Sequence, residues 1–115
     1  MKIAVPAEDK NLESLIDDRF GRAKGYIVYD TETKILGWID NQKNANASQG
    51  AGLKAAQSII ESGAEVLLSY DVGPKAFELL EKSGIISYRI ETKIKVDEVI
   101  AMFQENKLKK INKGE

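Results

Sequence analysis

Two short glycine-bearing segments carry the residue types in this chain that are best suited to binding chemistry. The first, residues 18–23, reads DRFGRA and places Arg19 and Arg22 three residues apart. Two guanidinium groups at this spacing can present forked N–H donors to one anionic group. The second, residues 48–52, reads SQGAG at the start of a helical pattern. Because the first N–H groups of a helix lack intrahelical acceptors, the two segments together predict a receptor for an anion.

Each segment also has a purely structural explanation. The arginines directly follow Asp17 and Asp18, so ion pairs within the loop would account for them. Ser48 is a favourable N-cap residue, and glycines are common at helix starts. Taken alone, each segment favours its structural explanation over the binding one.

A third segment, residues 71–74, reads DVGP and follows an apolar run at 66–68. A short, continuous apolar run is typical of a strand that is covered on both faces. The carboxyl end of such a parallel strand is where open α/β sheets usually bind ligands. We expect Asp71 to cap the following helix, and a carboxylate that binds a cation is the alternative.

The composition narrows the chemistry that the chain can perform. It contains no cysteine and no histidine, so thiolate and imidazole groups are unavailable as nucleophiles or as soft metal ligands. This favours a binding or carrier protein over an enzyme. Lysine and arginine number 17 against 18 acidic residues, for a formal net charge of −1, so no basic excess favours nucleic acid or an anionic membrane. The first apolar residues are too few for a signal peptide and no run reaches membrane-helix length, so we expect a cytoplasmic protein.

Hydrophobic periodicity predicts one domain over residues 1–115, with a loose basic tail from about 107 to 115. Residues 7–24 and 40–49 are polar and irregular, and the second stretch is typical of a mobile loop. The expected strands are 3–5, 26–29, 35–39, 66–68 and 85–88, and the expected helices are 50–62, 74–83 and 96–103.

This order of elements predicts the fold class. Strands two and three form an antiparallel hairpin. Strands four and five flank a helix, so they should be parallel with a right-handed crossover. We therefore expect a three-layer α/β domain with a mixed five-stranded sheet in the order 3-2-1-4-5, in which strand two is antiparallel. The two glycine-bearing segments should meet at one end of that sheet.

The chain resembles the dinitrogenase iron–molybdenum cofactor biosynthesis family. The resemblance rests on residues 1–6, 14–23, 50–52, 71–77 and 83–85, in an order and spacing that cover nearly the whole chain. It implies a ribonuclease-H-like three-layer fold. It also implies a nitrogenase accessory factor, because family members in nitrogen fixation bind or carry the iron–molybdenum cofactor or its iron–sulfur precursors. A cofactor-assembly protein is the partner that such a role implies.

Two positions depart from the family pattern. Members often have histidine directly before Phe-Gly-Arg and just before Gly-Ala-Gly, where this chain has Arg19 and Gln49. Direct coordination of iron by imidazole or thiolate is therefore not expected. What remains is outer-sphere recognition of an anionic cluster or oxyanion by arginines and a helix N-terminus.

The sequence thus predicts a non-enzymatic carrier for an anionic iron–sulfur or iron–molybdenum type cluster or a related small anionic ligand. One alternative is a small-molecule or protein-interaction module of the same fold that has lost cluster binding. A metal-dependent nuclease or phosphoesterase is a weaker alternative, because it rests on fold analogy alone. The expected site consists of Arg19, Phe20, Gly21, Arg22, Ser48, Gln49, Gly50, Ala51, Gly52, Asp71 and Gly73.

Overall fold

Strands and helices follow one another much as the hydrophobic pattern predicts. The computed structural model describes residues 1–47 and 49–112, so Ser48 and residues 113–115 lie outside the described part. The elements are β1 (Lys2–Ala7), β2 (Gly25–Asp30), β3 (Leu36–Asp40), α1 (Gln42–Ala45), α2 (Ala51–Glu61), β4 (Val66–Ser69), α3 (Pro74–Lys82), β5 (Ile86–Arg89), α4 (Val96–Gln104) and β6 (Lys109–Lys110).

The sheet is mixed and has the order β3-β2-β1-β4-β5-β6. Strand β1 pairs antiparallel with β2 and parallel with β4, and β4 pairs parallel with β5. The α/β class and the mixed sheet are confirmed, and the expected order 3-2-1-4-5 occupies the first five positions. The expected number of strands is wrong, because β6 adds a sixth at the end.

Strand β6 also corrects the expectation of a loose tail, as far as the structure describes that tail. Lys109 and Lys110 pair antiparallel with β5. The backbone N–H of Ile111 donates to the carbonyl oxygen of Ser87 at 2.8 Å, and the Ile111 side chain is buried. Burial of this apolar side chain after two exposed lysines holds the segment to the sheet.

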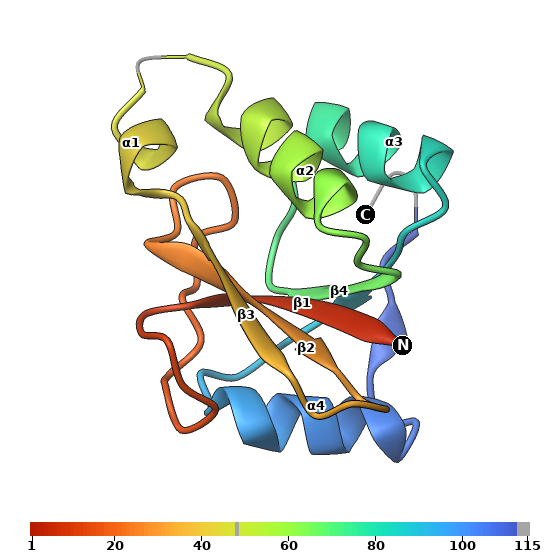
Figure 1. Ribbon diagram of the computed structural model, residues 1–115. Coiled ribbons are helices and arrows are strands. Elements are labelled where there is room, and N and C mark those ends of the chain that lie inside the picture. The colour runs from red at the N-terminus through yellow and green to blue at the C-terminus, as the bar shows by residue number, and fades with distance from the viewer. Residues whose placement is uncertain (48, 113–115) are drawn as a thin grey trace.

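The sheet separates two apolar layers, with α2 and α3 on one face and α4 on the other (Figure 1). Side chains alternate between the faces, as the pleat of a strand requires. Ala4 and Tyr26 pack toward α2 and α3, whereas Ile3, Val5 and Ile27 pack toward α4. All of these side chains are fully buried, so β1 and β2 form the centre of the core.

The topology brings four connections to one edge of the sheet. Strands β1, β3, β4 and β5 run in the same direction, because β2 is antiparallel to both β1 and β3. Their carboxyl ends therefore lead into residues 8–24, 41–50, 70–73 and 90–95 at the same edge. As far as the structure describes them, the three candidate binding segments, at 18–23, 48–52 and 71–74, lie in or beside these connections.

Residues 40–49 contain a short helix where we expect an irregular loop. Helix α1 spans Gln42–Ala45, and the backbone N–H of Gln42 donates to the Asp40 side chain at 2.9 Å. A helix of a single turn, held by one local side-chain hydrogen bond, is too short to show a hydrophobic period in the sequence. It therefore could not be predicted from that period. Within the described residues, no helix combines the length and apolar character needed to cross a membrane.

Candidate functional site

The two glycine-bearing segments meet at the edge where β1 ends. A Cβ atom placed on Gly21 would lie 2.8 Å from the backbone nitrogen of Gly52 and 2.9 Å from its Cα. Only glycine at position 21 permits this contact, because any side chain would overlap the backbone of the first turn of α2. The loop of residues 18–23 therefore packs directly on the start of that helix.

The guanidinium group of Arg19 forms an ion pair with a neighbouring carboxylate. Its Nε and Nη2 atoms donate to the two oxygens of Asp17 at 3.0 and 2.9 Å. The Asp17 side chain is 2% exposed and also accepts the backbone N–H groups of Arg19 and Lys24. Burial alone would raise the Asp17 pKa, but these hydrogen bonds outweigh it and hold the pKa below its ordinary 3.8. Arg19 thus completes the folding of the loop.

Arg22 ties the same loop to the end of α1. Its Nη1 donates to the carbonyl oxygens of Ala45 and Ala47 at 2.8 and 2.9 Å. The side chain is nevertheless exposed. Only Nη1 makes hydrogen bonds to described residues, so the other N–H groups of this guanidinium face no protein acceptor in that part of the chain.

Two asparagines organise the junction, and sequence reasoning missed both. Asn41 is 3% exposed, and its Nδ2 donates to the carbonyl oxygens of Gly21 and Ala23 at 3.0 and 2.8 Å. The Nδ2 of Asn44 donates to the carbonyl oxygen of Ala51 at 2.9 Å and to the Asn41 side chain at 3.0 Å. The only sequence signal is the abundance of asparagine and glutamine in residues 40–49, which resembles an ordinary loop.

Phe20 anchors the loop of residues 18–23 in the hydrophobic core. Its ring is buried, with its centroid 5.9 Å from that of Tyr26. The Tyr26 hydroxyl donates to the carbonyl oxygen of Phe20, and burial raises the pKa of this phenol well above its usual value. Phe20 therefore positions the loop and is not available as a contact surface.

The start of α2 carries no cap from a described side chain. Its N-cap residue is Gly50, which has a φ of 74°, and the first turn contains no acidic residue. Gln49 and Gly50 are exposed just before the helix. Whether Ser48 acts as a cap lies outside the described residues. The amide groups of Ala51 and Gly52 have no hydrogen-bond acceptor among the described residues.

Helix α3 begins in the same way beside α2. Its N-cap is Gly73, with no side-chain hydrogen bond, and no acidic residue follows in the first turn. A Cβ placed on Gly52 would lie 3.7 Å from the Cβ of Ala76, so the first turns of the two helices are in contact. Since each helix N-terminus carries roughly half a positive charge, two such ends side by side form a region of positive potential.

Asp71 does not cap α3, contrary to our expectation. The N-cap is Gly73, whose extended backbone (φ −59°, ψ 154°) leads into Pro74. The Asp71 carboxylate instead accepts a hydrogen bond from Nη1 of Arg89 at 2.8 Å, and it is 93% exposed. Asp71 lies two positions before the N-cap and is drawn to the guanidinium at the end of the neighbouring strand.

The described residues offer no set of side chains suited to direct ligation of a metal. Within residues 1–47 and 49–112, no three histidine, cysteine, aspartate or glutamate side chains gather closely enough to hold a metal ion. The complete sequence supplies neither thiolate nor imidazole. A metal–sulfur cluster would have to bind here as a preassembled anion, through hydrogen bonds to its outer sulfur atoms.

Comparison with known proteins gives a consistent family. A family model described as "Dinitrogenase iron-molybdenum cofactor" matches residues 1–106. An uncharacterized protein of Methanocaldococcus jannaschii is 31% identical over 113 residues, which cover 96% of this chain and 91% of that protein. The apo form of the orange protein from Desulfovibrio gigas superposes with a TM-score of 0.93 at 38% identity, covering 97% of this chain and 93% of that one.

A second solved structure agrees with the first. A NifB-like protein from Thermotoga superposes with a TM-score of 0.82 at 34% identity and covers 99% of this chain and 98% of its own. The family match, the curated relative and both structures extend over nearly the full length described. This chain is therefore a member of the dinitrogenase iron–molybdenum cofactor family.

Proposed function

We propose that this protein binds or carries an anionic metal–sulfur cluster, of the iron–sulfur or iron–molybdenum type, at the edge where α2 and α3 begin, without catalysing a reaction on it. The family points to a cofactor-binding or accessory protein. The observation that carries the finer proposal is the pair of adjacent helix starts at Gly50 and Gly73, where the described residues supply neither an acidic first turn nor a side-chain cap.

The physical basis is the charge and geometry of these two helix starts. A single anionic group near one helix N-terminus gains about 0.3–1 kcal/mol, and up to about 2 kcal/mol in partly buried sites. A cluster with several negative charges would face two such ends at once. A Cβ added to Gly50 or Gly73 would meet no described atom within 4 Å apart from the chain neighbours, so the described part of the chain leaves space beside the backbone there.

The arginines take different roles in this proposal. Arg19 is a positioning residue, because both oxygens of Asp17 occupy its guanidinium. Arg22 is exposed and engages only Nη1, so its remaining N–H groups are the ones we assign to the ligand. Phe20 and Gly21 hold the loop against α2, and Asp71 is not assigned to the ligand because its negative charge would repel it.

The absence of cysteine and histidine fits a carrier that releases its cargo. A cluster held by backbone N–H groups and one arginine forms no protein–metal bond, so transfer to an acceptor requires no ligand exchange at the metal. Gln49, exposed beside Gly50, supplies a further amide donor at this edge.

The proposal is tested by placing a charge at the helix start without changing side-chain shape. Gly50→Asp and Gly50→Asn differ only in charge, and both residues tolerate the left-handed backbone of this position. We expect Gly50→Asp to weaken binding of a synthetic iron–molybdenum–sulfur cluster at least tenfold and Gly50→Asn to weaken it less than threefold, measured anaerobically by amide NMR.

A matched control uses the other end of α3. Gly84 also has a positive φ, of 83°, and a Cβ added there would meet no atom within 4 Å. Gly84→Asp therefore introduces the same charge and the same backbone demand away from the proposed site, and it should bind the cluster as the unmodified protein does. Equal affinity of Gly50→Asp and Gly84→Asp would contradict the proposal.

A further inference from the structure

The two edges of the sheet differ in how well they are protected from pairing with another strand. At one edge, β6 is only two residues long, and both are exposed lysines. Short edge strands and lysines are common devices that prevent edge-to-edge association. At the other edge, β3 is five residues long and reads LGWID, with its single charge at the end. In Figure 1 no element lies in front of β3.

The backbone of β3 alternates between groups that pair with β2 and groups that face outward. Asp30 N–H donates to the carbonyl oxygen of Ile35, and Asn41 N–H donates to that of Lys24. In an antiparallel ladder these hydrogen-bonded pairs recur at every second residue. The backbone groups of Leu36, Trp38 and Asp40 therefore point away from the sheet, where no described strand pairs with them.

The side chains along this edge are apolar and incompletely covered. Ile35 is 67% exposed, and residues 36–39 are all half-buried. A groove of about 420 Å³ lies along the strand on the α2 side, with Val28, Ile35, Gly37 and Ile39 among its lining residues. Apolar surface beside unpaired backbone is the combination that favours the addition of a strand.

We propose that β3 pairs with β3 of a second copy of this chain, antiparallel and with Gly37 on the two-fold axis. In this register Leu36 and Trp38 of one copy exchange backbone hydrogen bonds with Trp38 and Leu36 of the other. Ile35 lies opposite Ile39 on the α2 side, where it extends over the apolar groove. Each apolar side chain of the strand thus meets an apolar partner.

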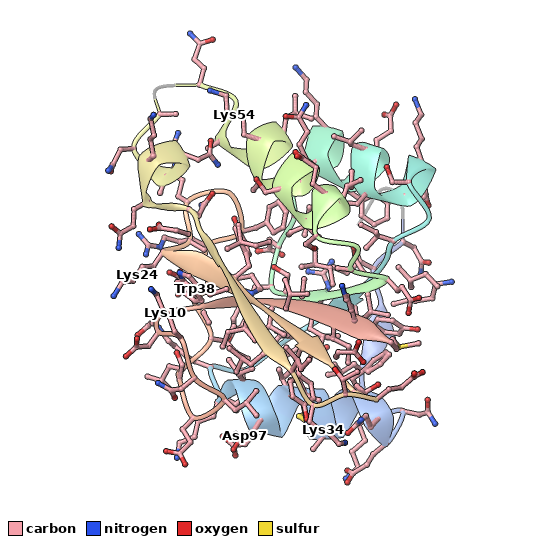
Figure 2. The ribbon with its side chains drawn as sticks, viewed as in Figure 1. Lys10, Lys24, Lys34, Trp38, Lys54 and Asp97 are labelled. Carbon is pink, nitrogen blue, oxygen red and sulfur yellow. The ribbon has the colours of Figure 1, made fainter. Side chains whose placement is uncertain are left out.

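Charge complementarity supports the same register. Lys34 precedes β3 and Asp40 ends it. Antiparallel pairing about Gly37 places Lys34 of each copy beside Asp40 of the other, which gives two opposite-charge pairs. Figure 2 shows Lys34 at one end of the hairpin, and Trp38 lies toward the other. An axis through Trp38 would instead place Leu36 opposite Asp40 and lose both matches.

A cysteine cross-link tests the register directly, because the chain has no cysteine of its own. In the proposed dimer the two Gly37 residues form a non-hydrogen-bonded pair, whose Cα atoms lie about 4.5 Å apart, within the range that a disulfide spans. A Cβ on Gly37 would approach nothing closer than 3.5 Å, so Gly37→Cys should fold normally.

We expect Gly37→Cys to form a disulfide-linked dimer under mild oxidation at least tenfold faster than Gly73→Cys. Gly73 is the control because it is exposed and a Cβ there meets no atom within 4 Å, but it lies away from β3. Equal cross-linking rates for the two variants would overturn the proposal.

Sedimentation of charge-reversed variants tests the same pairing without a covalent bond. Lys34 has a φ of 64°, which aspartate tolerates. Lys34→Asp should weaken dimerisation about tenfold by replacing two attractive pairs with two repulsive ones. Adding Asp40→Lys to it should restore most of the affinity, whereas a monomer at all concentrations for the unmodified chain would refute the proposal.

Discussion

The N-termini of α2, α3 and α4 all lie at the same edge of the sheet. They differ in whether the first N–H groups of the helix have hydrogen-bond partners. At α4, Val96 and Asp97 donate their N–H groups to the carbonyl oxygens of Ser14 and Leu12 at 2.9 and 2.8 Å. The Glu98 carboxylate accepts the Lys95 N–H at 3.0 Å. At α2 and α3 the described residues supply no such partners.

The three helix starts thus differ in the partners that the described residues give them. The first half of the long loop, residues 8–16, satisfies α4, and Asp97 and Glu98 add negative charge to its first turn. The second half, residues 17–24, packs against α2 without capping it. The same loop thus supplies hydrogen-bond acceptors to the helix on one face of the sheet, whereas the helix starts on the other face have no side-chain cap among the described residues.

The largest expected effect comes from removing the carboxylate that holds this loop together. Asp17→Ala removes the acceptor of four hydrogen bonds, and it should lower the free energy of unfolding by about 2–4 kcal/mol. It should also weaken the packing of the loop on α2 and on α4, because the same loop contacts both helices. Chemical denaturation measures the change, and Asp18→Ala is the neighbouring control.

The pH dependence of that loss has a definite sign. The Asp17 pKa is lower in the folded protein than its ordinary 3.8, so its stabilisation is fully present above pH 3.8 and disappears as the pH falls through the folded value. The stability difference between the unmodified protein and Asp17→Asn should therefore shrink below about pH 4. A difference that is constant from pH 2 to pH 6 would contradict this role.

The next effect comes from separating the loop from α2. Gly21→Ala places a methyl group 2.8 Å from the Gly52 nitrogen, and it should cost about 1–3 kcal/mol through the backbone shift that the overlap demands. Amide shifts should concentrate at Ala51 and Gly52 and leave Val96 and Asp97 unchanged. Gly73→Ala, with open space at its Cβ, is the control.

A smaller effect follows from removing the cap that α4 possesses. Glu98→Gln keeps the shape of the side chain and weakens its bond to the Lys95 N–H, so it should cost about 0.5–1 kcal/mol. Because the lost charge interaction is screened, the cost should decrease in 1 M salt. A neutral effect in low salt would show that the backbone carbonyls alone satisfy α4.

The smallest expected effect is a gain in stability at the N-terminus of α3, which has no side-chain cap among the described residues. Gly73→Asp supplies α3 with the side-chain cap and negative charge that it lacks, and it should raise stability by a few tenths of a kcal/mol to about 1 kcal/mol. Thermal unfolding measures it, with Gly73→Asn to separate capping from charge. Destabilisation by both substitutions would indicate that the N-terminus of α3 is not open.

Hydrophobic periodicity predicts the strands and the helix faces because those depend on apolar patterns, and the hairpin and crossover rules then predict the sheet order. The alternation in β2 sends Tyr26 to one face and Ile27 to the other, and the i, i+3, i+4 spacing of Val96, Val99 and Ile100 places them on the buried side of α4. These patterns reflect burial, because the spacing of apolar residues along the sequence shows which side chains share the buried face.

The details of the edge could not be predicted, because they rest on single polar contacts between distant residues. Asn41 reaches back to Gly21 and Ala23 across the junction, and no local spacing encodes that. Local spacing assigns Asp71 to the nearest helix, but its partner Arg89 lies on the next strand. Sequence proximity pairs Arg19 with an aspartate, as the structure does, yet it leaves open whether the guanidinium also faces a ligand.

The most direct test of the central claim is an anaerobic amide-NMR titration with a synthetic iron–molybdenum–sulfur cluster, with molybdate and phosphate as controls. Open helix ends predict saturable shifts at Ala51, Gly52 and Ala76 that are larger for the cluster than for either oxyanion, and no shifts at Val96 and Asp97. Absence of saturable shifts in the first turns of α2 and α3, or equal shifts at all three helix starts, would contradict the claim that this edge is a cluster site.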